Sequence, residues 1–173
     1  MITNVPEFWR PYIEINHIYF NDGTGRFQLF HGARDDFAKS VGIGRALAVG
    51  DFDNDGDLDL VVTNTAGAVR LYRNDAIKRG HWLMVRATDP RYGDRDAYGA
   101  VVSVICGSRK RTGCVSPGSG YLSSHDPRIH FGLGSADAVD RIEVVWQDGT
   151  REDFAGGPAD TVRILAFGQG TAP

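Results

Sequence analysis

Five carboxylates occupy alternate positions of one nine-residue segment, and they are Asp51, Asp53, Asp55, Asp57 and Asp59. Carboxylates this close repel one another, so folding them into one loop is costly unless a cation lies among them. Calcium takes roughly six to eight oxygen ligands, which suits this number of acidic groups. The segment therefore predicts a calcium site. The alternative is a solvated acidic turn that holds no ion.

The spacing also assigns a role to each position of the loop. The side chains expected to supply oxygens are those of Asp51, Asp53, Asp55 and Asp59. Position 7 of such loops usually gives its backbone carbonyl, so the carboxylate of Asp57 is the spare one. Gly56 permits the sharp turn that wraps the chain around the ion.

The flanks of the acidic segment decide which kind of loop it is. Calcium loops of the EF-hand type need a Glu at position 12 and a helix on each side, whereas position 12 here is Val62. Residues 46–50 and 58–62 are short runs of alternating or β-branched residues, which are typical of strands. The acidic segment is therefore expected to join the two strands of a hairpin.

Composition limits the class of protein. The 173 residues are 42% hydrophobic and 24% charged, which allows one large or two small globular domains. A net charge of −3 argues against a general nucleic-acid binder. No apolar run approaches the roughly 18 residues of a membrane span, and the N-terminus lacks the charged start and apolar core of a secretion signal. Because free calcium is plentiful outside cells, we expect a secreted, extracellular or periplasmic setting and a longer parent protein.

Beyond residue 80 the sequence changes to a series of short strands separated by turn signals. The first begins at His81, and the others are expected at residues 99–106, 109–116, 128–131, 141–146, 150–154 and 162–167. No stretch of this half has the periodicity of a helix. Short strands at this spacing favour a sandwich or barrel.

The first half contains a short internal sequence repeat and resembles a known repeat family. The sequence of residues 18–22 is similar to that of residues 71–75, 53 positions later. A repeat length near 50 residues is typical of propellers and of repeat arrays. Together with residues 50–60, the second copy resembles an FG-GAP repeat, also called a VCBS repeat, over about residues 14–76. The resemblance implies a β-propeller blade with calcium held in an inter-strand hairpin.

The second half is similar to another domain over about residues 80–167. Four segments carry the resemblance to the ASPIC/UnbV domain, in the right order: residues 95–100, 119–123, 130–134 and 144–149. That domain follows FG-GAP repeats in the cartilage acidic protein family and its bacterial relatives. We therefore expect an all-β chain with partial propeller blade structure in residues 1–78 and a compact sandwich-like or barrel-like UnbV domain in residues 79–173.

One blade cannot bury both of its faces, and its sheet edges stay unpaired. Relatives in this family carry several blades, whereas this chain has one complete acidic loop. Alone, the blade is expected either to pair its edges with a neighbour, which is edge-to-edge self-association, or to pack on its own UnbV domain.

Three other segments offer groups that take part in chemistry elsewhere. The segment 123–126 contains hydroxyl, imidazole and carboxylate groups, but adjacent loop residues rarely form a catalytic triad. We expect loop structure there, and a structural role for His130. The basic segment 109–111 would contact an acidic partner or, more simply, solubilise the end of a hairpin.

The two cysteines flank a turn at residues 107–110. A hairpin loop with an odd residue count would place Cys106 and Cys114 on one face, and a two-residue loop would place them on opposite faces. We expect the two-residue loop and free thiols.

Taken together, these features favour a calcium-binding, non-enzymatic binding or adhesion module whose ligand is a protein or a carbohydrate. No convergent set of nucleophile, base and oxyanion donor is present in the sequence pattern. The alternatives are an accessory domain of a larger enzyme and an RNA-binding module. RNA binding receives little support from three basic charges and no aromatic stacking motif.

Overall fold

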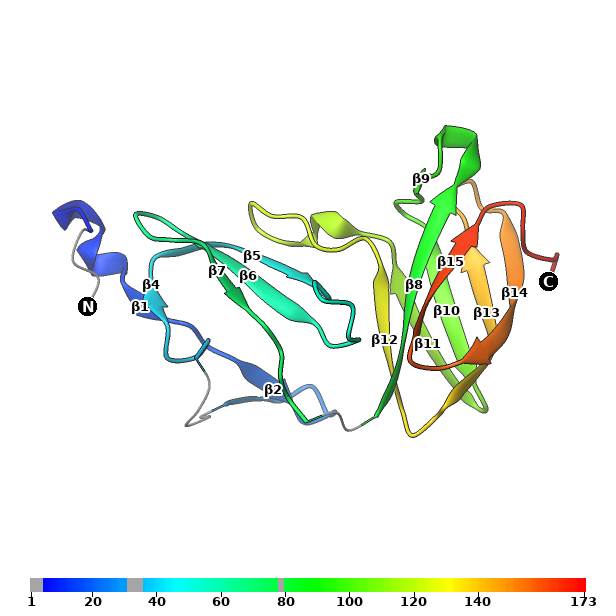
Figure 1. Cartoon of the computed structure of the whole chain (residues 1–173), viewed down its shortest axis with the longest axis horizontal. Helices are drawn as coiled ribbons and strands as arrows, with labels where there is room; N and C mark the ends of the chain where they lie inside the picture. Colours follow the sequence, from blue (N-terminus) through cyan, green and yellow to red (C-terminus); the bar gives the residue numbers. More distant parts are fainter. Residues whose placement is uncertain (1–4, 31–35, 78–79) are drawn as a thin grey trace.

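The computed structural model describes residues 5–30, 36–77 and 80–173, and it is built mostly of β-strands arranged in several small sheets (Figure 1). Helical structure in these described residues consists of three short 3-10 segments: η1 (Glu7–Tyr12), η2 (Pro90–Tyr92) and η3 (Pro117–Ser119). The expectation of a mainly β chain is confirmed. None of the helical segments described is long and apolar enough to cross a membrane.

The described residues of the N-terminal part form three sheets. Its strands are β1 (Glu14–Ile15), β2 (Tyr19–Asn21), β3 (Phe27–Leu29), β4 (Val41–Gly42), β5 (Gly44–Gly50), β6 (Asp59–Asn64) and β7 (Arg70–Tyr72). The largest sheet has the order β5-β6-β7, and β1 pairs with β4 and β2 with β3. The two copies of the internal sequence repeat, residues 18–22 and 71–75, overlap β2 and β7, so both copies contain a strand.

The C-terminal part contains two larger sheets. Its strands are β8 (His81–Asp89), β9 (Arg95–Asp96), β10 (Val101–Cys106), β11 (Arg109–Cys114), β12 (Ile129–Gly134), β13 (Ala138–Val145), β14 (Arg151–Pro158) and β15 (Thr161–Ala166). One sheet has the order β11-β10-β13-β14, and the other has the order β12-β8-β15, with β9 paired to β8. Each strand expected from the sequence in this half is present.

The hydrophobic core lies between these two sheets. Leu83 and Val85 of β8 are fully buried, and they share one cluster with Val102 and Ile142 from the facing sheet. Alternate residues of each strand point to the same side, which is why a period of two in the sequence produces a single apolar face. Fully burying one such side chain contributes about 1.5–3 kcal/mol, so this cluster is the main source of stability in the C-terminal part.

The N-terminal part, in contrast, leaves much apolar surface exposed. Among its exposed large side chains are Phe8, Tyr19, Phe20, Phe27 and Leu71, all more than half exposed. Every residue of β2 and β3 is exposed. This agrees with the expectation that a single blade cannot bury both faces. The expected division between residues 78 and 79 lies outside the described residues.

One edge of the β5-β6-β7 sheet is covered by the C-terminal part. The segment between β11 and β12, yellow-green in Figure 1, reaches across to β5. The amide of Asp126 donates to the carbonyl of Val49 at 2.9 Å, and the hydroxyl of Ser123 donates to the carbonyl of Leu47 at 2.7 Å. Packing of the β5-β6-β7 sheet on the C-terminal part of the chain is thus the arrangement observed at this edge, and self-association at other edges stays a prediction.

The cysteine hairpin follows the two-residue alternative. Cys106 lies opposite Arg109, so the loop is Gly107 and Ser108. Cys114 lies opposite Val101, five positions from Cys106, which places the two thiols on opposite faces of the sheet. Both cysteines are free.

Candidate metal centre

The acidic segment forms the loop between β5 and β6, as expected. Gly50 lies opposite Asp59, and this pair closes the hairpin. Two residues turn the chain with left-handed backbone, Asn54 at φ 59° and Gly56 at φ 95°. An Asn tolerates such a conformation and a Gly adopts it without steric cost, so these residue types at these positions produce the turn.

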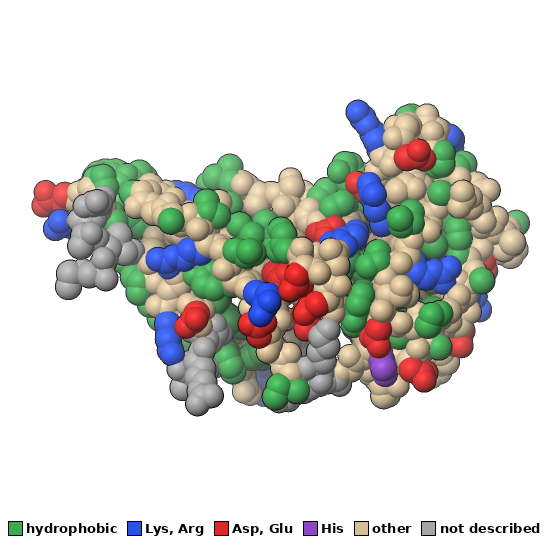
Figure 2. Space-filling model, in the orientation of Figure 1, with side chains coloured by type: hydrophobic (Ala, Val, Ile, Leu, Met, Phe, Trp, Pro, Cys, Tyr) green, Lys and Arg blue, Asp and Glu red, His purple; other side chains and the backbone are tan. Residues whose placement is uncertain are grey.

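Three of the five predicted ligands come together in this loop. Each of Asp51, Asp53 and Asp59 places one carboxylate oxygen so that all three atoms lie within 4.8 Å of one another. Asp51 and Asp59 are each only 2% exposed, whereas Asp53 is exposed. Figure 2 shows acidic side chains gathered near the middle of the molecule, where its two parts meet.

Backbone amides hold the two buried carboxylates in place. Asp51 accepts hydrogen bonds from the amides of Asp55 at 3.1 Å and Gly56 at 2.9 Å. Asp59 accepts from the amides of Phe52 at 3.0 Å and Asn74 at 2.8 Å. Each carboxylate oxygen has two lone pairs, so these bonds position the groups and still leave acceptor capacity for an ion.

No cationic side chain pairs with the buried carboxylates in the described part of the chain. Neither Asp51 nor Asp59 forms an ion pair there, and Asp53 meets only the guanidinium of Arg73, at 3.9 Å. Buried charges in proteins are paired with an opposite charge or coordinate a metal. The donor set, which consists of hard carboxylate oxygens, fits a metal ion at this position.

The remaining two predicted ligands lie outside this cluster. Asp55 is exposed and its carboxylate accepts a hydrogen bond from the amide of Asp57 at 2.9 Å. The participation of Asp55 and Asp57 in ion binding stays a prediction.

The C-terminal part supports the loop through residues that the sequence did not single out as its partners. Arg128 donates to the side-chain oxygen of Asn54 at 2.7 Å and to the carbonyl of Asp51 at 2.9 Å. The carboxylate of Asp126 holds this guanidinium at 2.5 Å, and that hydrogen bond raises the pKa of Arg128 above its ordinary value. One arginine therefore links the acidic loop to the strand β12 region of the other part.

An aromatic pair completes the support. His130 and Trp82 stack with ring centroids 6.3 Å apart and 13° between their planes. His130 Nε2 lies 2.9 Å from the carbonyl of Gly56, and since a carbonyl only accepts, Nε2 is the donor. A Cβ at position 56 would overlap the indole of Trp82. The structural role expected for His130 is thus observed, and its partner is the acidic loop.

The segment that offered hydroxyl, imidazole and carboxylate groups is occupied by structural contacts. Ser123 and Asp126 bind the backbone of β5 and the guanidinium of Arg128, as described above. The amide of Val49 donates to Nδ1 of His125 at 3.0 Å. These groups point to different partners and do not form a relay from carboxylate to imidazole to hydroxyl. Loop structure, as expected, is what they provide.

The basic segment 109–111 begins β11 directly after the two-residue loop. Its central residue, Lys110, forms an ion pair with Glu143 of β13 at 2.6 Å. The hydrogen bond from Lys110 also lowers the pKa of Glu143. One of the three charges is thus already neutralised by the protein itself.

Comparison with known proteins identifies both halves. The FG-GAP-like repeat family matches residues 9–62, and the family described as ASPIC and UnbV matches residues 91–172. Cartilage acidic protein 1 of Homo sapiens is 33% identical over 137 residues, which cover 76% of this chain and 20% of that protein. The Xenopus tropicalis protein of the same name is 32% identical over 137 residues, covering 76% of this chain and 21% of the relative.

The Mus musculus protein of that name is 33% identical over 117 residues, which cover 66% of this chain and 18% of the relative. The chain thus spans about a fifth of the length of these curated relatives. The matched families agree with the two resemblances drawn from the motifs, in the same order along the chain. The chain therefore carries an FG-GAP-like repeat followed by an ASPIC and UnbV domain, and it is distantly similar to part of cartilage acidic protein 1.

Proposed function

We propose that the acidic loop binds one calcium ion and that the chain is a non-enzymatic binding or adhesion module of an extracellular or periplasmic protein. The proposed ion is supported by the pair of buried carboxylates, Asp51 and Asp59, which have no cationic partner among the described residues. Together with Asp53 they lie around one point. The FG-GAP-like repeat supports the further proposal that β5, β6 and β7 belong to a propeller blade.

The chemistry of the ligands favours calcium over the other common metals. The three clustered side chains offer only oxygen, whereas zinc and copper prefer nitrogen or sulfur ligands. Magnesium demands a near-ideal octahedron and gives up its water reluctantly. A loop with several carboxylates and carbonyls suits the larger, less demanding calcium ion.

The ion has a mechanical consequence because the loop is also part of the junction between the two halves. Bound calcium neutralises the repulsion among the three carboxylates and holds exposed Asp53 against the buried pair. The same loop carries the carbonyls of Asp51 and Gly56, which accept hydrogen bonds from Arg128 and His130. An ordered loop therefore keeps the blade and the UnbV half in one fixed relation, which is the property an adhesion module needs from a structural ion.

Isothermal titration calorimetry of the whole chain, stripped with chelator, tests the metal site. One saturable calcium-binding event is expected, with competition by magnesium only at much higher concentration. Asp53→Asn, at the exposed member of the cluster, should strongly reduce the heat of binding, while Asp137→Asn, an exposed carboxylate of the other half, should preserve it. Identical isotherms for all of these proteins would contradict the site.

A glycan array, run in calcium and in EDTA, tests the proposed role as a binding module. Hits that disappear in EDTA would support a calcium-dependent carbohydrate ligand. If calcium raises the melting temperature but neither condition gives a hit, the ion is structural and the ligand is sought among proteins by crosslinking in calcium. Hydrolysis of any arrayed glycan would refute the non-enzymatic assignment.

A further inference from the structure

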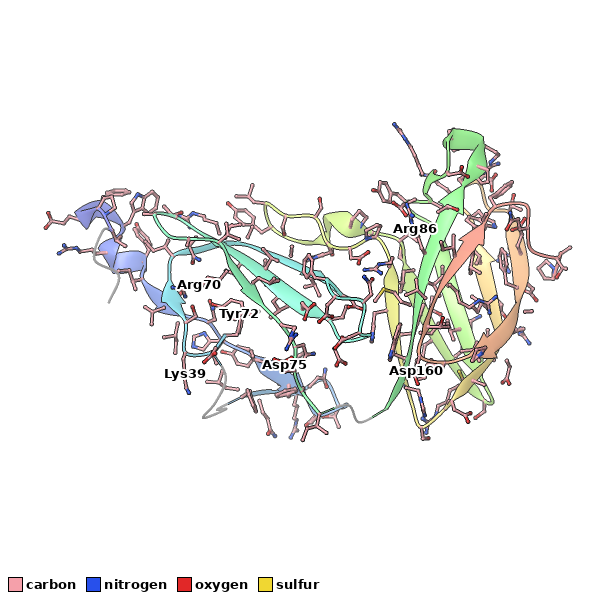
Figure 3. All side chains as sticks on the ribbon, in the orientation of Figure 1. Lys39, Arg70, Tyr72, Asp75, Arg86 and Asp160 are labelled. Atoms are coloured by element: carbon pink, nitrogen blue, oxygen red, sulfur yellow. The ribbon has the colours of Figure 1, made fainter. Side chains whose placement is uncertain are left out.

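A second candidate site lies in the N-terminal part, in a cavity that the acidic loop does not line. This cavity has a volume of about 780 Å³ and is bounded by Arg70 and Tyr72 of β7 together with Lys39, Ser40 and Val41. Figure 3 shows Arg70 and Tyr72 between β7 and β4, with Lys39 on the lower side of the same region. The calcium proposal uses none of these residues.

The hydroxyl of Tyr72 is the first indication that the cavity holds a ligand. This oxygen is buried, and among the described residues it has no hydrogen-bond partner. The ring is held in place by Phe37, whose centroid lies 5.2 Å away at an interplanar angle of 82°. Buried polar atoms are nearly always bonded, and each exception in a folded protein calls for a missing partner.

Arg70 is the second, independent indication. It lies two residues before Tyr72, so both side chains leave the same face of β7. Arg70 is half-buried and forms no ion pair in the described part of the chain. Partly burying a guanidinium without a carboxylate partner costs free energy unless an anion binds to it.

Arg70 and Tyr72 line the same cavity. An oxyanion satisfies both the guanidinium and the hydroxyl, whereas a neutral ligand would leave the guanidinium of Arg70 without a counter-charge among the described residues.

We propose that this cavity binds a single oxyanion group, with the guanidinium of Arg70 as its ion-pair partner and the hydroxyl of Tyr72 as a hydrogen-bond donor. The planar fork of Arg matches the oxygens of sulfate, phosphate or carboxylate. The group is either a free ion or an acidic substituent of a larger ligand, and both sources present the same oxygens. The inference goes beyond the calcium site and does not depend on it.

Nuclear magnetic resonance titration of the whole chain in calcium and low salt tests the proposal with sodium sulfate as the probe. Saturable shifts centred on β7 are expected for the parent. Tyr72→Phe removes only the hydroxyl and should weaken sulfate binding about tenfold or more, because a hydrogen bond to a charged group is lost. Arg70→Gln should weaken it further, and Arg26→Gln, an exposed arginine of the same part, should match the parent.

Thermal unfolding in sulfate-free buffer provides a readout that does not rely on binding. Because the Tyr72 hydroxyl has no partner within the described chain, Tyr72→Phe should melt at the parent's temperature or above it. A lower melting temperature would mean that the hydroxyl is bonded within the protein, and it would overturn the proposal. Linear, non-saturating shifts with sulfate would overturn it as well, and would assign ordinary water to the cavity.

Two further arms distinguish the source of the oxyanion. A sulfated disaccharide and its desulfated counterpart are titrated beside inorganic sulfate. Tighter binding of the sulfated sugar alone would identify an acidic glycan substituent, and equal affinity for free sulfate and the sulfated sugar would identify the free ion. In either case Arg70→Gln must reduce the affinity, since an unchanged affinity would contradict the assignment.

Discussion

Replacing Asp53 by Asn separates the contribution of the metal ion to stability from the contribution of the hydrogen bonds within the loop. Asp51 and Asp59 accept backbone hydrogen bonds, so changing them disturbs the fold even without an ion. The Asp53 side chain is 41% exposed, and its nearest cation is Arg73 at 3.9 Å, so its carboxylate holds little of the hairpin together. Any large effect of Asp53→Asn must therefore come from the ion.

The size of the effect follows from mass action. With a dissociation constant of about 10⁻⁴ M, as in extracellular calcium modules, about 10 mM calcium stabilises the folded state by about 2.7 kcal/mol. At about 2–4 °C per kcal/mol for a chain of this size, calcium should raise the parent's melting temperature by about 5–11 °C. A site weakened about thirtyfold retains about 0.9 kcal/mol of this, which leaves a rise of only about 2–4 °C.

In chelator the same substitution has the opposite sign. Two unit charges at 4.8 Å repel by about 1 kcal/mol in the dielectric of water, and by more in a partly buried loop. Removing the charge of Asp53 relieves this repulsion against both buried carboxylates. The variant should thus melt at or above the parent in EDTA and well below it in calcium.

Differential scanning calorimetry of parent and variant in both buffers measures all four values. Asp75→Asn is the matched control, since its carboxylate contacts the same Arg73 at 2.7 Å but lies outside the acidic cluster. That control should keep the full calcium response. Equal losses for Asp53→Asn in calcium and EDTA, or a parent that does not respond to calcium, would refute the reasoning.

Other substitutions probe the junction and the surface charges. Arg128→Gln should lower the free energy of unfolding by about 1.5–3 kcal/mol in a urea titration, because it removes hydrogen bonds that join the two halves; an unchanged midpoint would show that the junction adds no stability. Gly56→Ala should cost about 2–5 kcal/mol, from the left-handed backbone and the overlap with the neighbouring indole, whereas Gly25→Ala, at a similar φ in open space, should cost about 1–2 kcal/mol. Equal costs would exclude the indole contact. The hydrogen bond from Arg91 lowers the pKa of Asp148 from 3.8 to about 2, so folding favours the ionised carboxylate. The stability advantage of the parent over Asp148→Asn should be complete above about pH 4 and should disappear as the pH falls toward 2, as measured by chemical unfolding at each pH; an advantage independent of pH would contradict the ion pair.

The acidic loop and the strands around it could be predicted because the information is local. Nine consecutive residues bring their own carboxylates together once a turn forms, and Gly56 makes that turn possible. Alternating apolar residues mark the strands of the C-terminal part, and the two-residue cysteine hairpin follows from side-chain alternation alone. The sequence therefore determined the elements, the hairpin that carries the candidate metal site and the kinds of atoms it offers.

Only the tertiary structure decided which distant groups meet. Asn54 and Arg128 are 74 positions apart, and β15 pairs with β8 in parallel although most of the C-terminal half separates them. The position of an arginine or a histidine in the sequence does not specify which residue it contacts. The same residue types occur in exposed loops, in ion pairs and in contacts between two parts of a chain. The hydroxyl of Tyr72, which has no hydrogen-bond partner among the described residues, likewise becomes apparent only in the folded structure. Local spacing can place ligands within one turn of chain, but long-range contacts depend on how the sheets pack, which no single segment encodes.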